Sequence, residues 1–166
     1  MTTDQFIQIL GVNNLVLPDG AQDMLMRYVA LLKDWNAKIN LISRKDEEHI
    51  LDKHVLHSLV LRMPAICDYV FSNKTVVDLG TGGGLPGIPL KTVTPSCDMT
   101  LIDSVQKKIG ACKAMISELG LTGIEAISGR AEELARLPKF FFTHSMPSFP
   151  ALLLRWMNLQ NGAKDY

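Results

Sequence analysis

The sixteen residues from Thr75 to Leu90, TVVDLGTGGGLPGIPL, constrain the fold of this chain most. The first five are mostly β-forming residues with an acid near the end, which predicts a buried parallel strand over Thr75–Leu79. The glycines that follow permit the positive φ angles of a tight turn, and they let a ligand lie against the backbone. The apolar run from Ile88 then predicts a helix start. Strand, glycine turn and helix start form the nucleotide-cofactor geometry of a doubly wound sheet.

The acid at the end of this strand narrows the choice of cofactor. A dinucleotide-binding loop spaces its glycines as G-x-G-x-x-G, so that a pyrophosphate meets the helix N-terminus. Here the pattern is D-x-G-x-G-G-G, and Asp78 would repel phosphate but suits a cationic or hydroxyl-bearing ligand. About 20 residues further on, Asp103 ends a second apolar run, where an acid can accept both hydroxyls of a ribose. S-adenosylmethionine, which has an ammonium, a sulfonium and no phosphate, fits these features, and a glycine turn without a ligand is the alternative.

Five short motifs follow one another along residues 20–134. They are N-L-I-S-R-K from Asn40, K-H and S-L from Lys53 to Leu59, D-L-G-T-G-G-G-L-P-G-I-P from Asp78, L-I-D-S and K-K from Leu101 to Lys108, and G-R-A-E from Gly129. In this combination the chain resembles the bacterial RsmG family, also called GidB. Members of that family methylate N7 of a guanine in small-subunit ribosomal RNA. The G-L-P-G-I-P extension is more particular than the glycine loop that methyltransferases share.

The resemblance implies an α/β fold, a doubly wound parallel sheet of the Rossmann-like class I methyltransferase type with an N-terminal helical lead-in. It also implies S-adenosylmethionine as cofactor, S-adenosylhomocysteine as product, and ribosomal RNA or the small ribosomal subunit as partner. Guanine N7 has a free lone pair and no proton, so no general base is required and we expect no catalytic side chain. Transfer then depends on proximity, alignment and desolvation.

The residues expected around the cofactor sit at the carboxyl ends of strands, where open α/β sheets bind ligands. The backbone of Gly80 and Leu85 is expected to lie against the methionine part. Gly82 and Gly84 are expected to permit the turn. Asp78 is expected to order the loop or to meet the ammonium through a water molecule.

The ribose and adenine are expected at the next two strand ends. Asp103 would accept the ribose hydroxyls, with Ser104 beside it. By resemblance, the Ala131 amide and the Glu132 carboxylate would recognise the polar edge of the adenine. Taken alone, Glu132 also suits a helix N-terminus, where the helix dipole favours an acid.

The charge balance gives no overall electrostatic signal for nucleic acid, because 17 basic residues face 17 acidic ones. Local groups of cations remain, either as RNA contacts or as solvated faces. The candidates for RNA contact are Arg44, His54, Lys107, Lys108 and Arg130. Arg130 suits a structural role equally well.

The remaining composition favours a cytoplasmic protein. No 18-residue apolar run and no signal-peptide pattern is present. The cysteines at 67, 97 and 112 are odd in number and lack C-x-x-C spacing, which indicates reduced thiols and neither disulfides nor zinc. His54 and His57 lie three residues apart, but no further Cys or His cluster accompanies them, so we expect no metal site.

Apolar spacing divides the chain into an N-terminal helical extension over 1–63 and a methyltransferase core over 64–166. The extension is expected to pack on the core and to contain helices over Met1–Leu10, Gln22–Asn36 and from about Arg44 to Met63. In the core, the strands expected after the first are Met99–Ile102, Ile124–Ser128 and Phe140–Thr143. The helices expected there are Pro86–Lys91, Val105–Leu119, one opening over Gly129–Leu134, and Phe149–Leu159.

The core is expected to be incomplete at its C-terminal end. A methyltransferase sheet of this kind normally has about seven strands, and four can be placed here. The segment Phe140–Pro147 also lacks the Asp and the later Arg-Ala pair of the family. Either the protein is shortened and divergent, or stretches are absent between the printed residues, and we expect the second. Two other functions stay open: a small-molecule or protein methyltransferase, which the neutral charge permits, and a non-catalytic cofactor-binding or RNA-binding module.

Overall fold

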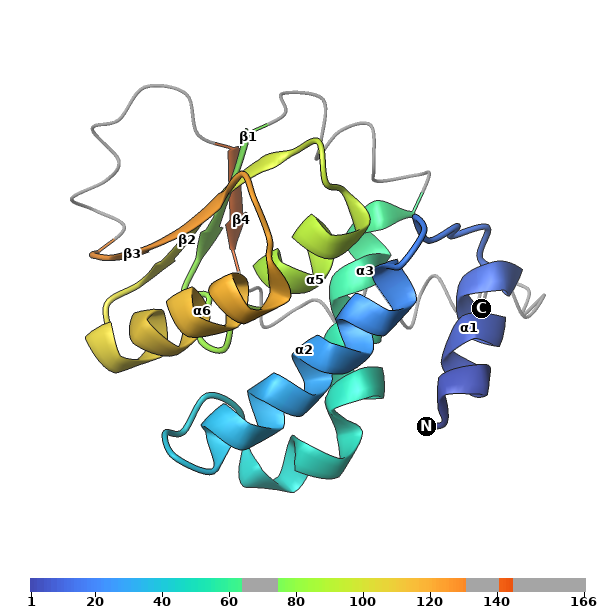
Figure 1. Ribbon diagram of the computed structural model, residues 1–166, viewed down its shortest axis with the longest axis horizontal. Helices are drawn as coiled ribbons and strands as arrows, with labels where there is room; N and C mark the ends of the chain where they lie inside the picture. Colours follow the sequence, from blue (N-terminus) through green and yellow to red (C-terminus); the bar gives the residue numbers. More distant parts are fainter. Residues whose placement is uncertain (64–74, 131–140, 145–166) are drawn as a thin grey trace, which may run out of the picture.

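The computed structural model describes residues 1–63, 75–130 and 141–144 (Figure 1). Four parallel strands form one sheet in the order β3-β2-β1-β4. Their bounds are β1 Thr75–Leu79, β2 Asp98–Asp103, β3 Ile124–Ser128 and β4 Phe141–His144. The predicted α/β fold with a parallel sheet is confirmed. The strand order changes direction between β1 and β4, and doubly wound sheets bind ligands at the carboxyl ends of their strands at such a switch point.

Helices precede the sheet and connect its strands. Their bounds are α1 Thr3–Val12, α2 Ala21–Asn36, η1 Arg44–His49, η2 Ile50–Leu56, α3 His57–Leu59, η3 Val60–Arg62, α5 Gly87–Val93 and α6 Gln106–Leu119. The predicted stop of α6 is present, because Gly120 follows it in the left-handed conformation with a φ of 68°.

The segment from Arg44 to Met63 is not the single α-helix that its apolar spacing predicts. It begins as a 3-10 helix (η1), continues as a π-helix (η2), and ends in short α and 3-10 turns. Ile50 and Val55 are both buried although they lie five residues apart. A π-helix bonds residues five apart, so its wider turn places these two side chains on the same face.

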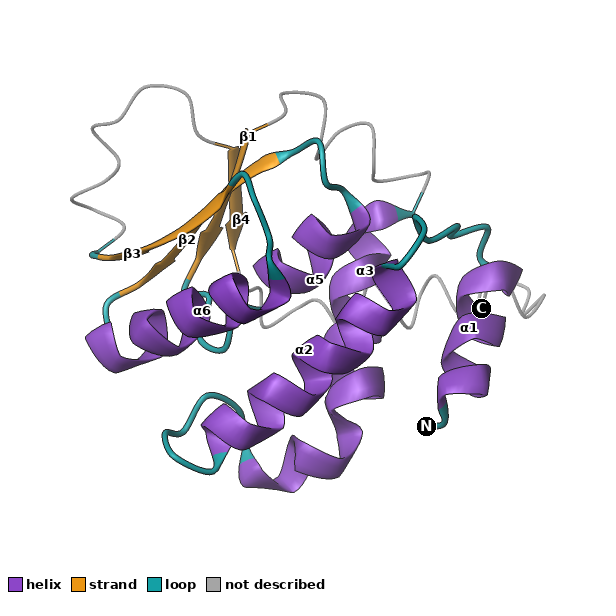
Figure 2. Cartoon of the chain, in the orientation of Figure 1, coloured by secondary structure: helices purple, strands orange, loops and turns teal. Residues whose placement is uncertain are grey.

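The helices form layers on one side of the sheet. Helices α5 and α6 pack on the strands, and α2 lies across α5 and α6 (Figure 2). Buried side chains from all these layers join one hydrophobic cluster, for example Phe6, Leu25, Ile88 and Met115. Helix α2 packs on α5 and α6, and α1 packs on η2. Since burying one such side chain contributes roughly 1.5–3 kcal/mol, α1 and α2 stabilise the same core as the helices that cover the sheet.

Some expectations concern residues beyond the described part. Ala131, Glu132, Cys67 and the helix expected over Phe149–Leu159 lie outside the described residues. Residues 131–140 and 145–166 lie outside them altogether, so the expected incompleteness of the core at its C-terminal end remains a prediction. Within the described ranges, every helix is too short or too polar to cross a membrane.

Candidate functional site

The strand register brings three expected site segments to one edge of the sheet. Leu79 of β1 pairs with Ile102 of β2, and Asp103 of β2 pairs with Ser128 of β3. The backbone continues this alignment beyond the strands, because Gly80 N donates to Ile102 O at 2.8 Å and Gly129 N donates to Asp103 O at 3.1 Å. The carboxyl ends of β1, β2 and β3 therefore lie side by side.

The loop after β1 has the conformation for which its glycines were expected. Gly80, Gly82 and Gly84 have φ angles of 72°, 57° and 89°. These values lie in the left-handed region, which side chains with a Cβ rarely adopt. Inside the loop, the amides of Gly84 and Leu85 both donate to Thr81 O at 2.9 Å. The residues 80–85 thus form a tight, internally bonded turn, called the glycine loop below.

Asp78 lies beneath the glycine loop and holds it to α5. The residue is 1% exposed, and its Oδ2 accepts hydrogen bonds from the Thr81 hydroxyl at 2.7 Å and from Gly87 N at 3.0 Å. Its Oδ1 is buried without a hydrogen-bond partner. Burial raises the pKa of Asp78 to about 7; the two hydrogen bonds oppose this rise and the nearby Asp103 adds to it. A carboxyl group in this state favours a proton or a nearby cation.

Asp103 connects the end of β2 to both neighbouring segments. Its Oδ2 accepts from Gly82 N at 3.0 Å, and its Oδ1 accepts from Val105 N at 2.8 Å. The residue is 8% exposed, whereas the adjacent Ser104 is exposed. Each carboxylate oxygen can accept a second hydrogen bond, so these contacts leave acceptor capacity for a ligand. Asp103 therefore orders the loop, a role that its position at a strand end does not predict.

The two sides of the glycine loop differ in exposure. Gly80 is exposed and Leu85 is half-buried, while Gly83 and Gly84 are buried. A Cβ built on Gly83 would lie 2.6 Å from Leu32 Cδ1, so this part of the loop is in close contact with α2. The side of the loop toward Gly80 is the side that a ligand can reach.

Two side chains that sequence reasoning missed also bond to the loop. The Tyr28 hydroxyl donates to Gly83 O at 2.9 Å, and the Cys112 thiol donates to Gly82 O at 3.4 Å. Both residues lie on apolar stripes of helices, and such spacing predicts burial but not the partner of a hydroxyl or thiol. Burial raises the pKa of Cys112 to about 12, so the thiol remains a neutral donor.

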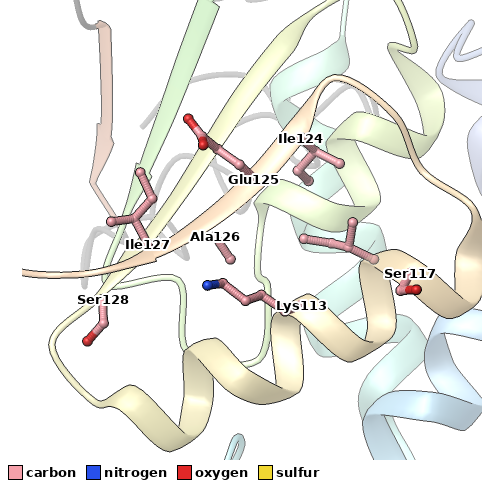
Figure 3. Close-up of a pocket in the computed structure, with 8 residues that line it drawn as sticks. Lys113, Ser117, Ile124, Glu125, Ala126, Ile127 and Ser128 are labelled. Atoms are coloured by element: carbon pink, nitrogen blue, oxygen red, sulfur yellow. The ribbon is translucent and has the colours of Figure 1, made fainter.

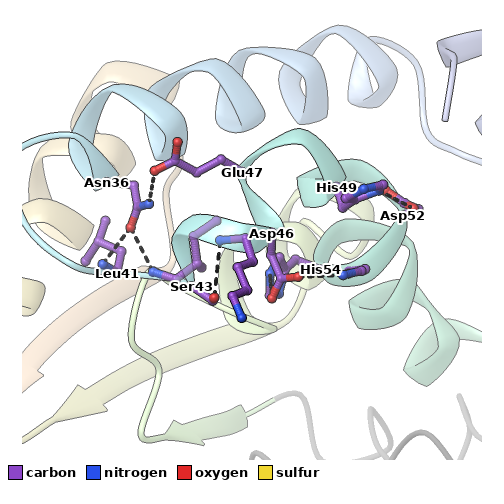
Figure 4. A network of polar contacts seen from close by, with 11 residues as sticks. Asn36, Leu41, Ser43, Asp46, Glu47, His49, Asp52 and His54 are labelled. Carbon is purple, nitrogen blue, oxygen red and sulfur yellow. Dashed lines mark hydrogen bonds and ion pairs between the residues drawn. The ribbon is translucent and has the colours of Figure 1, made fainter.

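A buried amide, that of Asn36, holds the turn after α2 in place (Figure 4). Asn36, 6% exposed, accepts from the backbone N–H groups of Leu41 at 2.8 Å and Ile42 at 2.9 Å, and it donates to Glu47 at 2.6 Å. A Cβ on Gly83 would lie 3.3 Å from Leu41 Cβ. The segment that leads into Arg44 thus packs directly against the loop.

The basic residues of this segment differ in how far they are neutralised. Lys53 is paired with Asp46 at 2.6 Å, and Lys33 with Glu48 at 2.7 Å. Arg44 is exposed. His54 is half-buried, with its Nε2 at 3.8 Å from Asp46 Oδ2 and without a hydrogen bond. Burial lowers the pKa of His54 although Asp46 opposes this, so the ring is neutral at physiological pH.

The other expected RNA contacts lie at the same edge of the sheet. Lys107 and Lys108 are in the first turn of α6, four and five residues after Asp103, and are exposed and half-buried respectively. Arg130 is exposed and follows Gly129 at the end of β3. The structure therefore brings these three cations to the edge that carries the glycine loop, on the side of β2 and β3.

A separate groove of about 420 Å³ lies between α6 and β3 (Figure 3). Lys113 and Ser117 of α6 line it on one side, and Ala126 and Ser128 of β3 on the other. None of the described residues expected to bind the cofactor lines this groove. Among the described residues, no three His, Cys, Asp or Glu side chains lie close enough together to hold a metal ion.

Comparison with known proteins gives one family. A family model described as rRNA small subunit methyltransferase G (GidB) matches residues 21–145. The protein called ribosomal RNA small subunit methyltransferase G in Chlorobaculum tepidum is 52% identical over 114 residues, which are 69% of this chain and 51% of that protein. Proteins with the same description in Chlorobium limicola and Serratia proteamaculans are 44% and 38% identical, over 81% and 80% of this chain and 60% and 61% of their own lengths. The chain thus spans about half to three fifths of the length of these curated relatives.

Proposed function

The chain belongs to the rRNA small subunit methyltransferase G family, and from this we propose that it transfers a methyl group from S-adenosylmethionine to N7 of a guanine in small-subunit ribosomal RNA. The observation that carries the proposal is the glycine loop between two acid-tipped strands. Asp78 lies under the loop and accepts hydrogen bonds from the Thr81 hydroxyl and from Gly87 N at the start of α5. Asp103 lies beside the loop and accepts a hydrogen bond from Gly82 N. Such a site suits a cation and rejects phosphate.

The residues at this edge fit the proposed cofactor. The exposed Gly80 and half-buried Leu85 offer backbone to its methionine part. A nearby cationic group favours the ionised form of Asp78, whose unpartnered Oδ1 then carries negative charge. The remaining lone pairs of Asp103, with the exposed Ser104 beside it, suit the hydroxyls of a ribose.

The remaining expected contacts complete this assignment. Gly82 and Gly84 allow the backbone to turn under the ligand, since both have positive φ. By family resemblance, the Ala131 amide and the Glu132 carboxylate meet the adenine. These two residues follow Gly129, whose amide is bonded to Asp103 O.

The proposed methyl transfer requires no acid or base from the side chains. When bound, S-adenosylmethionine supplies a methyl group on a sulfonium, which is a reactive electrophile. Guanine N7 attacks with its own lone pair and loses no proton, so the protein needs no general base. The residues of the edge act by holding the two reactants in line and by excluding water. We therefore assign no catalytic acid or base.

The RNA is proposed to approach the edge between the turn after α2 and the first turn of α6. Arg44, His54, Lys107, Lys108 and Arg130 would contact it, four as cations that attract phosphates and His54 as a neutral hydrogen-bonding ring. N7 lies on the major-groove edge of guanine, which is hard to reach in a paired A-form helix. The target guanine is therefore expected in an unpaired region of ribosomal RNA or of the assembling small subunit.

Methyl transfer tests this function. Protein would be incubated with S-adenosylmethionine labelled in its methyl group and with small-subunit RNA or subunits from cells lacking the gene, and N7-methylguanine would be mapped by strand cleavage. We expect label at one guanine. Label on protein or on small molecules instead would favour another class of methyltransferase. Binding of S-adenosylhomocysteine without any transfer would favour a non-catalytic module.

A further inference from the structure

The N-terminal helical segment reaches the glycine loop through one buried hydroxyl. Tyr28 lies in α2 and is 0% exposed, and its hydroxyl donates to Gly83 O at 2.9 Å across a sequence separation of 55 residues. The hydrogen bond is itself fully buried. Burial raises the pKa of Tyr28 well above its ordinary value, so the hydroxyl remains a donor throughout the physiological range.

The loop offers this hydroxyl a well-defined target. The peptide between Gly83 and Gly84 is held at both ends, since its carbonyl accepts from Tyr28 and its N–H donates to Thr81 O at 2.9 Å. The neighbouring amide of Gly82 is held by Asp103 at 3.0 Å. Leu32 of α2 packs against Gly83 and leaves no room for a Cβ there. The orientation of the loop backbone thus depends on α2 as well as on the sheet.

We propose that Tyr28 is a positioning residue for the cofactor, acting through the Gly83 carbonyl to keep the glycine loop in its binding conformation. This inference rests on the proposed function, because it assumes that the loop receives S-adenosylmethionine. Tyr28 touches neither the cofactor nor the RNA in this scheme. Its contribution is pre-organisation: a loop already in the bound conformation loses less conformational freedom when the ligand binds.

The substitution Tyr28→Phe removes the donor and keeps the ring that packs in the core. The Gly83 carbonyl then remains buried without its partner, and the loop can relax to find another. We expect the affinity for S-adenosylhomocysteine, measured by calorimetry, to fall about 3- to 10-fold, as for the removal of one hydrogen bond. With RNA as substrate, KM for S-adenosylmethionine should rise by a similar factor while kcat changes less than about two-fold.

Hydrogen exchange provides a readout that needs no ligand. In Tyr28→Phe, the exchange of the Gly84 and Leu85 amides, which bond to Thr81 O, should accelerate about 3- to 10-fold more than that of the Leu101 amide in β2, whose rate follows the global stability. Leu10→Ala is the matched control. Leu10 is buried in the same hydrophobic cluster but lies in α1, and Leu10→Ala should lower the melting temperature without a selective effect on the loop.

The outcomes separate this inference from the proposed function. Unchanged loop exchange and unchanged affinity in Tyr28→Phe would overturn the positioning role. An equal loss of affinity in Leu10→Ala would also overturn it, because the effect would then follow from general stability. If the wild-type protein bound no S-adenosylhomocysteine, the proposed function would fail, and exchange at Gly84 and Leu85 would still decide whether Tyr28 orders the loop.

Discussion

The carboxylate of Asp103 accepts a hydrogen bond from the backbone N–H of Gly82 at 3.0 Å, which joins the tip of β2 to the glycine loop after β1. The same carboxylate accepts from Val105 N, just before α6. One side chain therefore fixes the loop, the strand end and the start of the next helix relative to one another. Any ligand at this edge meets a site whose parts are already held in place.

The first prediction concerns this carboxylate. Asp103→Ala should weaken binding of S-adenosylhomocysteine by about 1–3 kcal/mol, since it removes an acceptor for the ligand and a partner of the Gly82 amide. Titration calorimetry measures the decrease in affinity. Asp98→Ala, at the exposed opposite end of the same strand, is the matched control and should leave the affinity unchanged. Equal affinities for wild type and Asp103→Ala would place the ribose elsewhere.

The second prediction concerns the proton on Asp78. Burial raises the pKa of Asp78 from 3.8 to about 7, so the folded state holds this proton more tightly than the unfolded state does. The stabilisation is complete below pH 4 and is lost as the pH rises to 7, by roughly 1.4 kcal/mol per unit of pKa difference. Asp78→Asn carries no such proton.

Urea unfolding from pH 4 to pH 8 tests this difference. The free energy of unfolding of Asp78→Asn, relative to that of wild type, should rise between pH 4 and 7 and then remain constant. The total rise should approach roughly 4 kcal/mol. Parallel stability curves for the two proteins would show that Asp78 has an ordinary pKa in the fold.

The third prediction compares two glycines that differ in the space around them. At Gly87, a Cβ would collide with Leu101 Cδ2 and lie 2.9 Å from Asp78 Oδ2. Gly87→Ala should therefore lower the free energy of unfolding by about 1–3 kcal/mol through overpacking. At Gly110, within α6, a Cβ meets nothing within 4 Å, and Gly110→Ala should raise it by roughly 0.5–1 kcal/mol through helix propensity. Urea unfolding measures both changes. If both variants changed the free energy of unfolding in the same direction, the close packing around Gly87 in α5 would be contradicted.

The fourth prediction concerns RNA. Lys45 follows Arg44 and is exposed like it, so the two cations are changed together. The double variant Arg44→Gln, Lys45→Gln should weaken binding to small-subunit RNA and reduce the slope of log K against log salt by about 0.7 for each phosphate that the variant no longer neutralises. Lys33→Gln is the control, because the Lys33 ammonium is already paired with Glu48 at 2.7 Å. Filter binding at several salt concentrations measures both. If the salt slope decreased equally in Lys33→Gln, the segment around Arg44 would not be a specific RNA contact.

The parts of the fold that the sequence predicts well are those with strong local signals. The bounds of β1 and β3 agree with the predicted ones because a β-forming run ends at a glycine in each case. The positive φ angles of Gly82 and Gly84 follow from their place in a tight turn. The end of α6 is predicted just as well, because a glycine such as Gly120 readily adopts the left-handed conformation that ends many helices.

The parts that it predicts poorly depend on contacts between distant segments. Apolar spacing places Tyr28 in the core but says nothing about the Gly83 carbonyl that its hydroxyl meets. Apolar spacing also does not predict the burial of Asn36, whose side-chain oxygen accepts hydrogen bonds from the backbone N–H groups of Leu41 and Ile42 in the following turn. The π-helix over Ile50–Leu56 also escapes it, because the spacing of four between Leu51, Val55 and Leu59 predicts an ordinary α-helix.

The central claim is that the carboxyl ends of β1, β2 and β3 bind S-adenosylmethionine, and an amide-resolved NMR titration with S-adenosylhomocysteine tests it most directly. We predict that the largest shifts fall on the amides of Gly80, Ser104 and Gly129, and that Lys113 and Ser117 in the α6–β3 groove stay unperturbed. Shifts confined to that groove, or none anywhere at millimolar ligand, would contradict the claim.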